Sequence, residues 1–179
     1  MPKNVSRSAG VLAVLALLWA SGCSTETQPE AESVTENYNR VDVMFAQMMV
    51  PHHADAIAMA DYLQGVRGVD PRVQGLAEGI VTSQQRENEE MNTWLSERGY
   101  PQVDDGAMRV DEEAVAGQSA EAAQEQFLSE MIAHHEHGVD MAASAARRGQ
   151  SPTVTDLAAG MVQDQTQEIQ QMRQLLADD

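Results

Sequence analysis

Apolar residues recur at intervals of three and four along four long segments, which is the spacing of one face of an α-helix. Glycine or proline interrupts the pattern between the segments, and no stretch shows the alternation of a strand. Asp70-Pro71 and Ser151-Pro152 are typical helix starts, because a capping side chain precedes a proline at the first helical position. The expected helices run from residue 41 to about 64, from 71 to about 98, from about 121 to 149, and from 152 almost to the C-terminus.

The second pair of segments repeats the first. Phe45, Met49, His52, His53, Met59 and Ala60 correspond, 82 residues later, to Phe127, Met131, His134, His135, Met141 and Ala142. One pair of helices cannot bury its apolar faces alone, so two pairs are expected to pack together. The sequence therefore predicts an all-α fold, a four-helix bundle of two repeated helical hairpins that is ferritin-like in general architecture. We expect the bundle domain over 38–179, with repeat one at about 40–98, a linker at about 99–118 and repeat two at about 119–178.

The chain before the bundle has the layout of a secretory signal peptide. Two basic residues precede an apolar run over 11–19, which is too short to span a bilayer, and small residues then precede Cys23. This resembles the bacterial lipobox, in which cleavage exposes a cysteine for lipidation, although Ala20 stands where most lipoboxes have Leu. The alternative is ordinary cleavage that leaves a free thiol. We expect a signal peptide over 1–22, a lipidated Cys23 with a flexible tether over 23–37, and an exported protein anchored to the extracytoplasmic side of the cell membrane.

The chain is strongly acidic. It has 28 acidic and 11 basic residues, which give a formal net charge of −17. Such a surface repels nucleic acid and attracts cations, so nucleic-acid binding is not among the expected functions. The need for an exported protein to be soluble is enough to explain most of this negative charge. No feature of the sequence indicates an oligomeric state.

All five histidines lie in two octets with matching surroundings, MMVPHHAD at 48–55 and EMIAHHEH at 130–137. Residues four and seven apart share one face of a helix. One stripe of the first helix therefore holds Met48, His52, Asp55 and Met59, and the neighbouring stripe holds Met49 and His53. In the third helix, one stripe holds Glu130, His134, His137 and Met141, and the neighbouring stripe holds Met131 and His135. Adjacent histidines differ by about 100° around the helix axis. One of each pair can face the interior of the bundle, and the sequence does not decide which one.

Imidazole, thioether and carboxylate side chains gathered in this way are typical of a metal site. Thioethers favour Cu(I), and histidine with carboxylate suits Cu(II), so copper is the expected ion and these twelve side chains are its candidate ligands. Zinc is the rival, but Met is a poor zinc ligand and the domain has no Cys. A di-iron site is disfavoured because Glu130 and His134 are four residues apart instead of three. Since imidazole binds metal only without its proton, and its ordinary pKa is about 6.5, Cu(II) is expected to leave as the pH falls to about 5.

The same residues have other interpretations. A methionine at helical spacing is most often part of a core, which is the interpretation for Met44 and Met161. The bundle can also be purely structural or protein-binding, with histidines that serve packing. An enzyme is a third class, for example a hydrolase with a His-His pair as acid and base, but no Ser or Cys nucleophile lies in a recognisable motif.

Two motifs occur in both halves of the chain. Met-x-x-His-His occupies 49–53 and 131–135, and Gln-x-x-Glu-x-x-x-Met occupies 84–91 and 165–172. In these motifs, and over about residues 40–178, the sequence resembles the bacterial domain-of-unknown-function family 305. The resemblance implies an exported helical bundle; some members, the CopM-like ones, bind copper and are linked to copper tolerance. We therefore expect a membrane-tethered, non-catalytic protein that sequesters or passes on copper, with two sites that can differ because Asp55 of the first half is replaced by His137.

Overall fold

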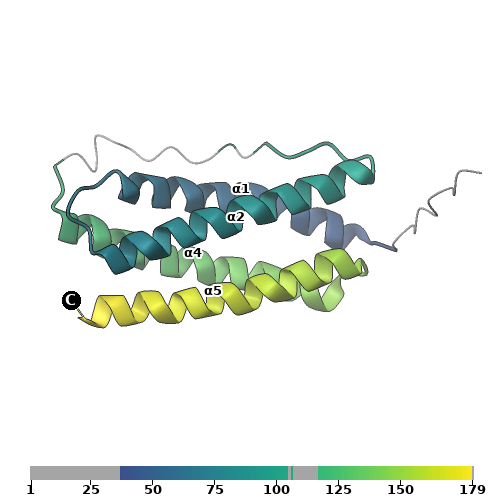
Figure 1. Cartoon of the computed structure of the whole chain (residues 1–179). Coiled ribbons are helices and arrows are strands. Elements are labelled where there is room, and N and C mark those ends of the chain that lie inside the picture. The colour runs from purple at the N-terminus through teal and green to yellow at the C-terminus, as the bar shows by residue number, and fades with distance from the viewer. Residues whose placement is uncertain (1–36, 105, 107–116, 179) are drawn as a thin grey trace, which may run out of the picture. The chain divides into compact units, whose positions relative to one another are not determined.

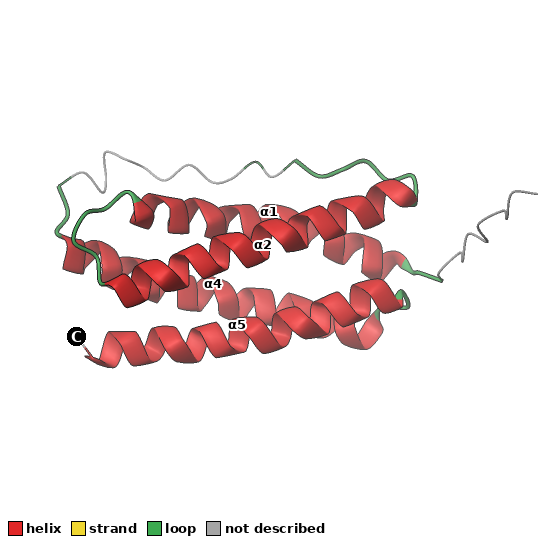
Figure 2. Cartoon of the chain, in the orientation of Figure 1, coloured by secondary structure: helices red, strands yellow, loops and turns green. Residues whose placement is uncertain are grey.

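The computed structural model describes residues 37–104, 106 and 117–178. This part of the chain contains no strand and forms four helices, α1 (Arg40–Gln64), α2 (Pro71–Glu97), α4 (Ala120–Arg148) and α5 (Pro152–Asp178) (Figures 1 and 2). The prediction of an all-α four-helix bundle is confirmed, and each helix begins and ends within two residues of its expected bounds. None of these helices is both long enough and apolar enough to cross a membrane. The predicted signal peptide, Cys23 and all of the tether except residue 37 lie outside the described residues.

Each helix begins at a side chain that accepts hydrogen bonds from its first turn. Asn39 caps α1, where its Oδ1 accepts from Val41 N at 2.7 Å, while the Asp42 carboxylate accepts from Asn39 N at 2.8 Å. Asp70 caps α2 in front of Pro71, as the sequence predicts. Ser151 does the same for α5, since its Oγ accepts from Val154 N at 3.2 Å.

The two hairpins, α1 with α2 and α4 with α5, are joined mainly along α1 and α4. These two helices run antiparallel, because Asn39 before α1 donates from Nδ2 to the carbonyl of Arg148 at the end of α4, 2.8 Å away. The buried carboxylate of Asp42 strengthens this end by accepting from the backbone N–H groups of Gln150 and Ser151 at 3.0 and 3.3 Å. One side chain of the first hairpin therefore holds the turn of the second.

The interior consists of two apolar clusters with polar side chains between them. One cluster surrounds Leu63, Ile80 and Met131, and the other surrounds Met49, Leu95 and Met161. Each cluster takes residues from all four helices. The buried polar side chains at the middle of the helices are His53, Gln84, Glu87, Asn88, His135 and Gln165. Burying a polar group is costly unless it has a partner, so this layer is where a functional site is expected.

Candidate metal centre

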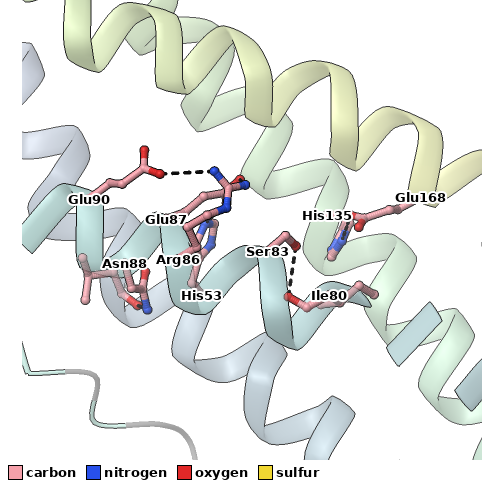
Figure 3. Close-up of polar contacts among 10 residues, drawn as sticks. His53, Ile80, Ser83, Arg86, Glu87, Asn88, Glu90, His135 and Glu168 are labelled. Carbon is pink, nitrogen blue, oxygen red and sulfur yellow. Dashed lines mark hydrogen bonds and ion pairs between the residues drawn. The ribbon is translucent and has the colours of Figure 1, made fainter. Parts of the chain in front are cut away.

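Two of the buried histidines form matching pairs with glutamates. His53 on α1 lies 2.8 Å from Glu87 on α2, and His135 on α4 lies 2.9 Å from Glu168 on α5, in each case from Nε2 to Oε2 (Figure 3). Both rings are fully buried. With a carboxylate as the acceptor, Nε2 carries the proton and donates it. The Nδ1 atom of each ring is buried and has no hydrogen-bond partner in the described part of the chain.

The glutamates of these pairs are site residues that the analysis of single clusters missed. Glu87 and Glu168 come from the repeated Gln-x-x-Glu-x-x-x-Met motif, whose members are three and seven residues apart and so share one helix face. In both copies of the motif the glutamine and the methionine are buried. Of the two glutamates, Glu87 is buried and Glu168 is half-buried. The signal was therefore present in the sequence, as a motif that faces the histidines from the partner helix.

Two of the other three histidines, His52 and His134, meet between the hairpins. The rings of His52 on α1 and His134 on α4 are stacked, with centroids 3.8 Å apart and an angle of 30° between their planes. His137, about one turn after His134 on α4, is exposed, and its ring centroid lies 5.2 Å from that of His52. The structure thus decides which member of each adjacent pair faces the interior: His53 and His135 do, whereas His52 and His134 lie at the edge between α1 and α4.

The stacked histidines are electrically neutral at neutral pH. Burial, followed by the neighbouring ring of His134, lowers the pKa of His52 from 6.5 to about 3. Burial, followed by His135, lowers the pKa of His134 to about 4, against the opposing charge of Asp55. All four ring nitrogens of this pair are buried without a hydrogen-bond partner among the described residues. The expectation that Cu(II) leaves by pH 5 used the ordinary pKa and must be corrected for these two histidines.

Methionines line a groove beside this cluster. Met44, Met48 and Met141 border a groove of about 300 Å³ between α1 and α4, together with Val41, Phe45, Ser144, Ala145 and Arg148. Met48 is 53% exposed and Met44 is 43% exposed. The interpretation of Met44 as a core residue is therefore wrong, because its stripe of α1 faces the open side of the α1–α4 contact. Met161 is buried in the core, as expected.

The remaining candidate ligands are placed differently. Met49 and Met131 are fully buried, one in each apolar cluster, and Met59 packs against the core from its margin. Glu130 is exposed and accepts a hydrogen bond from Gln126 at 2.9 Å. The structure thus brings together His52, His134 and His137, with Asp55 as a charged neighbour of His134, while Met48 and Met141 line the groove between the same two helices.

The donor set fits a transition-metal ion, although the side chains are not gathered around one point. In the described ranges no three His, Cys, Asp or Glu side chains are arranged to hold a metal. The rings of His52 and His134 nevertheless present buried nitrogens without partners, which neutral imidazole supplies as metal ligands.

Residues 42–176 match a protein family described as Domain of unknown function (DUF305). The chain belongs to the DUF305 family. Among solved structures, it is similar to CopM in the Ag-bound form, with 33% identity and a TM-score of 0.67 over 76% of this chain and 96% of that chain. CopM in the Cu(II)-bound form matches over the same shares at 31% identity and a TM-score of 0.67. A DUF305 fragment from Deinococcus radiodurans matches at 27% identity and a TM-score of 0.66, over 79% of this chain and 98% of that one.

A curated relative is also found, the uncharacterized protein L153 of Acanthamoeba polyphaga mimivirus. It is 44% identical over 57 residues, which make up 32% of this chain and 37% of that protein. The match spans little more than a third of the relative's length, so the relative adds no function.

Proposed function

We propose that this DUF305 protein binds copper at the contact between α1 and α4. His52, His134 and His137 would hold Cu(II), and Met48 and Met141 would supply thioethers to Cu(I). The observation that carries the proposal is the stacked pair His52 and His134, whose four buried nitrogens have no partner in the described residues. The similarity to CopM, which has been crystallised with Cu(II), Cu(I) and Ag, supports the choice of copper.

Copper is favoured over zinc by the chemistry of the groove. Exposed methionines are unusual, because a thioether is apolar and normally lies in a core. Here Met48 is more than half exposed and lines the same groove as Met141. Thioether ligands prefer soft Cu(I) and contribute little to zinc binding. The buried Met49 and Met131 are not needed for this role.

The role that fits these side chains is binding and not catalysis. The three edge histidines are accompanied by thioethers, and the motifs hold no Ser or Cys nucleophile. We propose that the protein sequesters or passes on copper outside the cytoplasm, tethered to the membrane by lipid on Cys23. This location rests on the apolar run over 11–19 and the small residues before the cysteine.

A titration of the purified protein with copper tests the proposal. Affinity should be measured by competition with a chelator, under oxidising conditions for Cu(II) and under reducing conditions for Cu(I). Replacing the three edge histidines by Ala should abolish specific Cu(II) binding and leave part of the Cu(I) binding. Replacing Met48 and Met141 by Leu should do the reverse, because Leu keeps the apolar volume and removes the sulfur.

Two comparisons make this test decisive. Met49→Leu combined with Met131→Leu is the matched control, since these buried methionines should leave binding of both ions unchanged. Zinc added in excess should compete poorly with Cu(I). A wild-type protein that binds neither copper ion specifically would favour the purely structural bundle and end the proposal.

A further inference from the structure

Gly138 on α4 lies against two side chains that belong to different hairpins. A Cβ atom on Gly138 would stand 2.5 Å from Oε1 of Gln165 on α5 and 3.1 Å from Cε1 of His52 on α1. Both distances are shorter than the 3.5–4.0 Å at which carbon atoms make favourable contact. The glycine therefore leaves open the space in which the amide of Gln165 approaches the imidazole of His52.

The Gln165 amide lies in this space without a partner of its own. Its side chain is only 4% exposed, and neither Oε1 nor Nε2 has a hydrogen-bond partner in the described part of the protein. Leaving a buried polar group unpaired costs about 1–3 kcal/mol. The atom of His52 nearest to Gly138 is Cε1, which is bonded to both ring nitrogens, and these nitrogens are also unpaired. An amide acceptor and an imidazole with a proton to donate are thus held close together.

We propose that Gln165 positions His52 for metal binding, an inference that rests on the proposed function. Neutral imidazole has one N–H donor and one lone pair. When the lone pair binds a metal ion, the N–H is normally donated to an oxygen, which fixes the tautomer and the orientation of the ring. His53 already has such an acceptor in Glu87. Oε1 of Gln165 supplies the acceptor for His52, from the opposite hairpin.

The matching place in the first half is built differently. Ala56 corresponds to Gly138 and carries the Cβ atom that the glycine lacks. The amide of Gln84, the buried counterpart of Gln165, therefore lacks the space to approach His134 in the same way. His134 interacts instead with the carboxylate of Asp55. The two stacked histidines consequently bind the ion with unequal support, an amide on one side and a carboxylate on the other.

Three variants of the purified full chain test the role of Gln165. Gln165→Leu removes the acceptor and should weaken Cu(II) binding by about 10- to 100-fold, the usual effect of losing a partner of a metal-binding histidine. The electron paramagnetic resonance spectrum of bound Cu(II) should change its copper hyperfine splitting, because the orientation of the His52 ring changes. Gln165→Glu keeps an acceptor oxygen at the same reach and should restore both affinity and spectrum. Gly138→Ala should resemble Gln165→Leu, since the new methyl group displaces the amide.

Gln84→Leu is the matched control, because it removes an equally buried amide from the corresponding position. It should change the free energy of unfolding by about as much as Gln165→Leu does, and it should leave the spectrum of Cu(II) unchanged. If the wild type binds Cu(II) but Gln165→Leu binds it equally well, or if both Leu variants weaken it equally, the positioning role is wrong while the proposed function stands. If the wild type binds no copper, both fail. Circular dichroism identifies a Gly138→Ala protein that does not fold, and the Gln165 variants then decide the outcome alone.

Discussion

Lowering the pH from about 7.5 to about 5 should leave the affinity of His52 and His134 for Cu(II) nearly unchanged. Competition from the proton weakens metal binding to a histidine by a factor of 1 + 10^(pKa − pH). With an ordinary pKa of about 6.5, each histidine would weaken binding about 30-fold at pH 5. With a pKa of about 3 for His52 and about 4 for His134, the loss from either is about 1.1-fold or less.

Two measurements check this prediction. The Cε1–H resonances of the metal-free protein report the protonation of each ring, and those of His52 and His134 should not shift until the pH is well below 5. Chelator competition at both pH values gives the affinity for Cu(II), and the His137→Ala variant removes the exposed histidine from the comparison. An affinity of that variant that falls 30-fold or more would refute the argument, because the rings would then titrate as they do in water.

The same lowered pKa values predict how folding stability depends on pH. In the unfolded chain both imidazoles accept protons near pH 6.5, whereas in the folded protein they stay neutral to about pH 4. The unfolded state thus binds more protons in this range, so these two groups make the free energy of unfolding fall as the pH drops below 6.5. Urea unfolding at several pH values should show this loss, and it should be reduced in a variant with both histidines replaced by Gln.

Three further predictions concern other parts of the chain. Asp42→Ala should lower the free energy of unfolding by at least about 2 kcal/mol, because the backbone N–H groups of Asn39, Gln150 and Ser151 lose an acceptor. Asp61→Ala, at an exposed place on the same helix, should have little effect in urea unfolding. His53→Leu and Glu87→Leu should each cost about 3–5 kcal/mol, and the double variant should cost less than their sum, because neither partner is left buried alone. Cys23→Ser should release the protein from membranes; a variant that still sediments with them would contradict the lipid anchor.

The helices could be predicted from the sequence because caps, prolines and apolar spacing all agree at Asp70-Pro71 and Ser151-Pro152. The metal-binding hypothesis was also available, since two matched histidine octets stand out from the rest of the chain. Which histidine of each pair faces inward could not be predicted. The two differ by about 100° around the helix, and the angle that faces the interior depends on how α1 packs against α4.

Other features of the site depend on contacts between distant residues. The stacking of His52 on His134, with its effect on both pKa values, brings together residues from different hairpins. Met44 was misplaced because helical spacing shows which residues share a stripe but not whether another helix covers that stripe. Glu87 and Glu168 could have been identified as partners of the histidines, since their motif accompanies the histidine motif in both halves.

The division of the interior into two clusters has a consequence for a hairpin made alone. Since all four helices contribute to each cluster, neither hairpin has a core of its own, and a single hairpin would leave an apolar face open to water. A hairpin made alone from residues 38–104 should therefore associate with a second copy of itself, which sedimentation can detect as a dimer. In such a dimer His52 would face its own symmetry mate where it now faces His134. The proposed copper site would then be shared by two identical copies, whereas in the single chain its two sides differ in sequence, with Asp55 on one and His137 on the other.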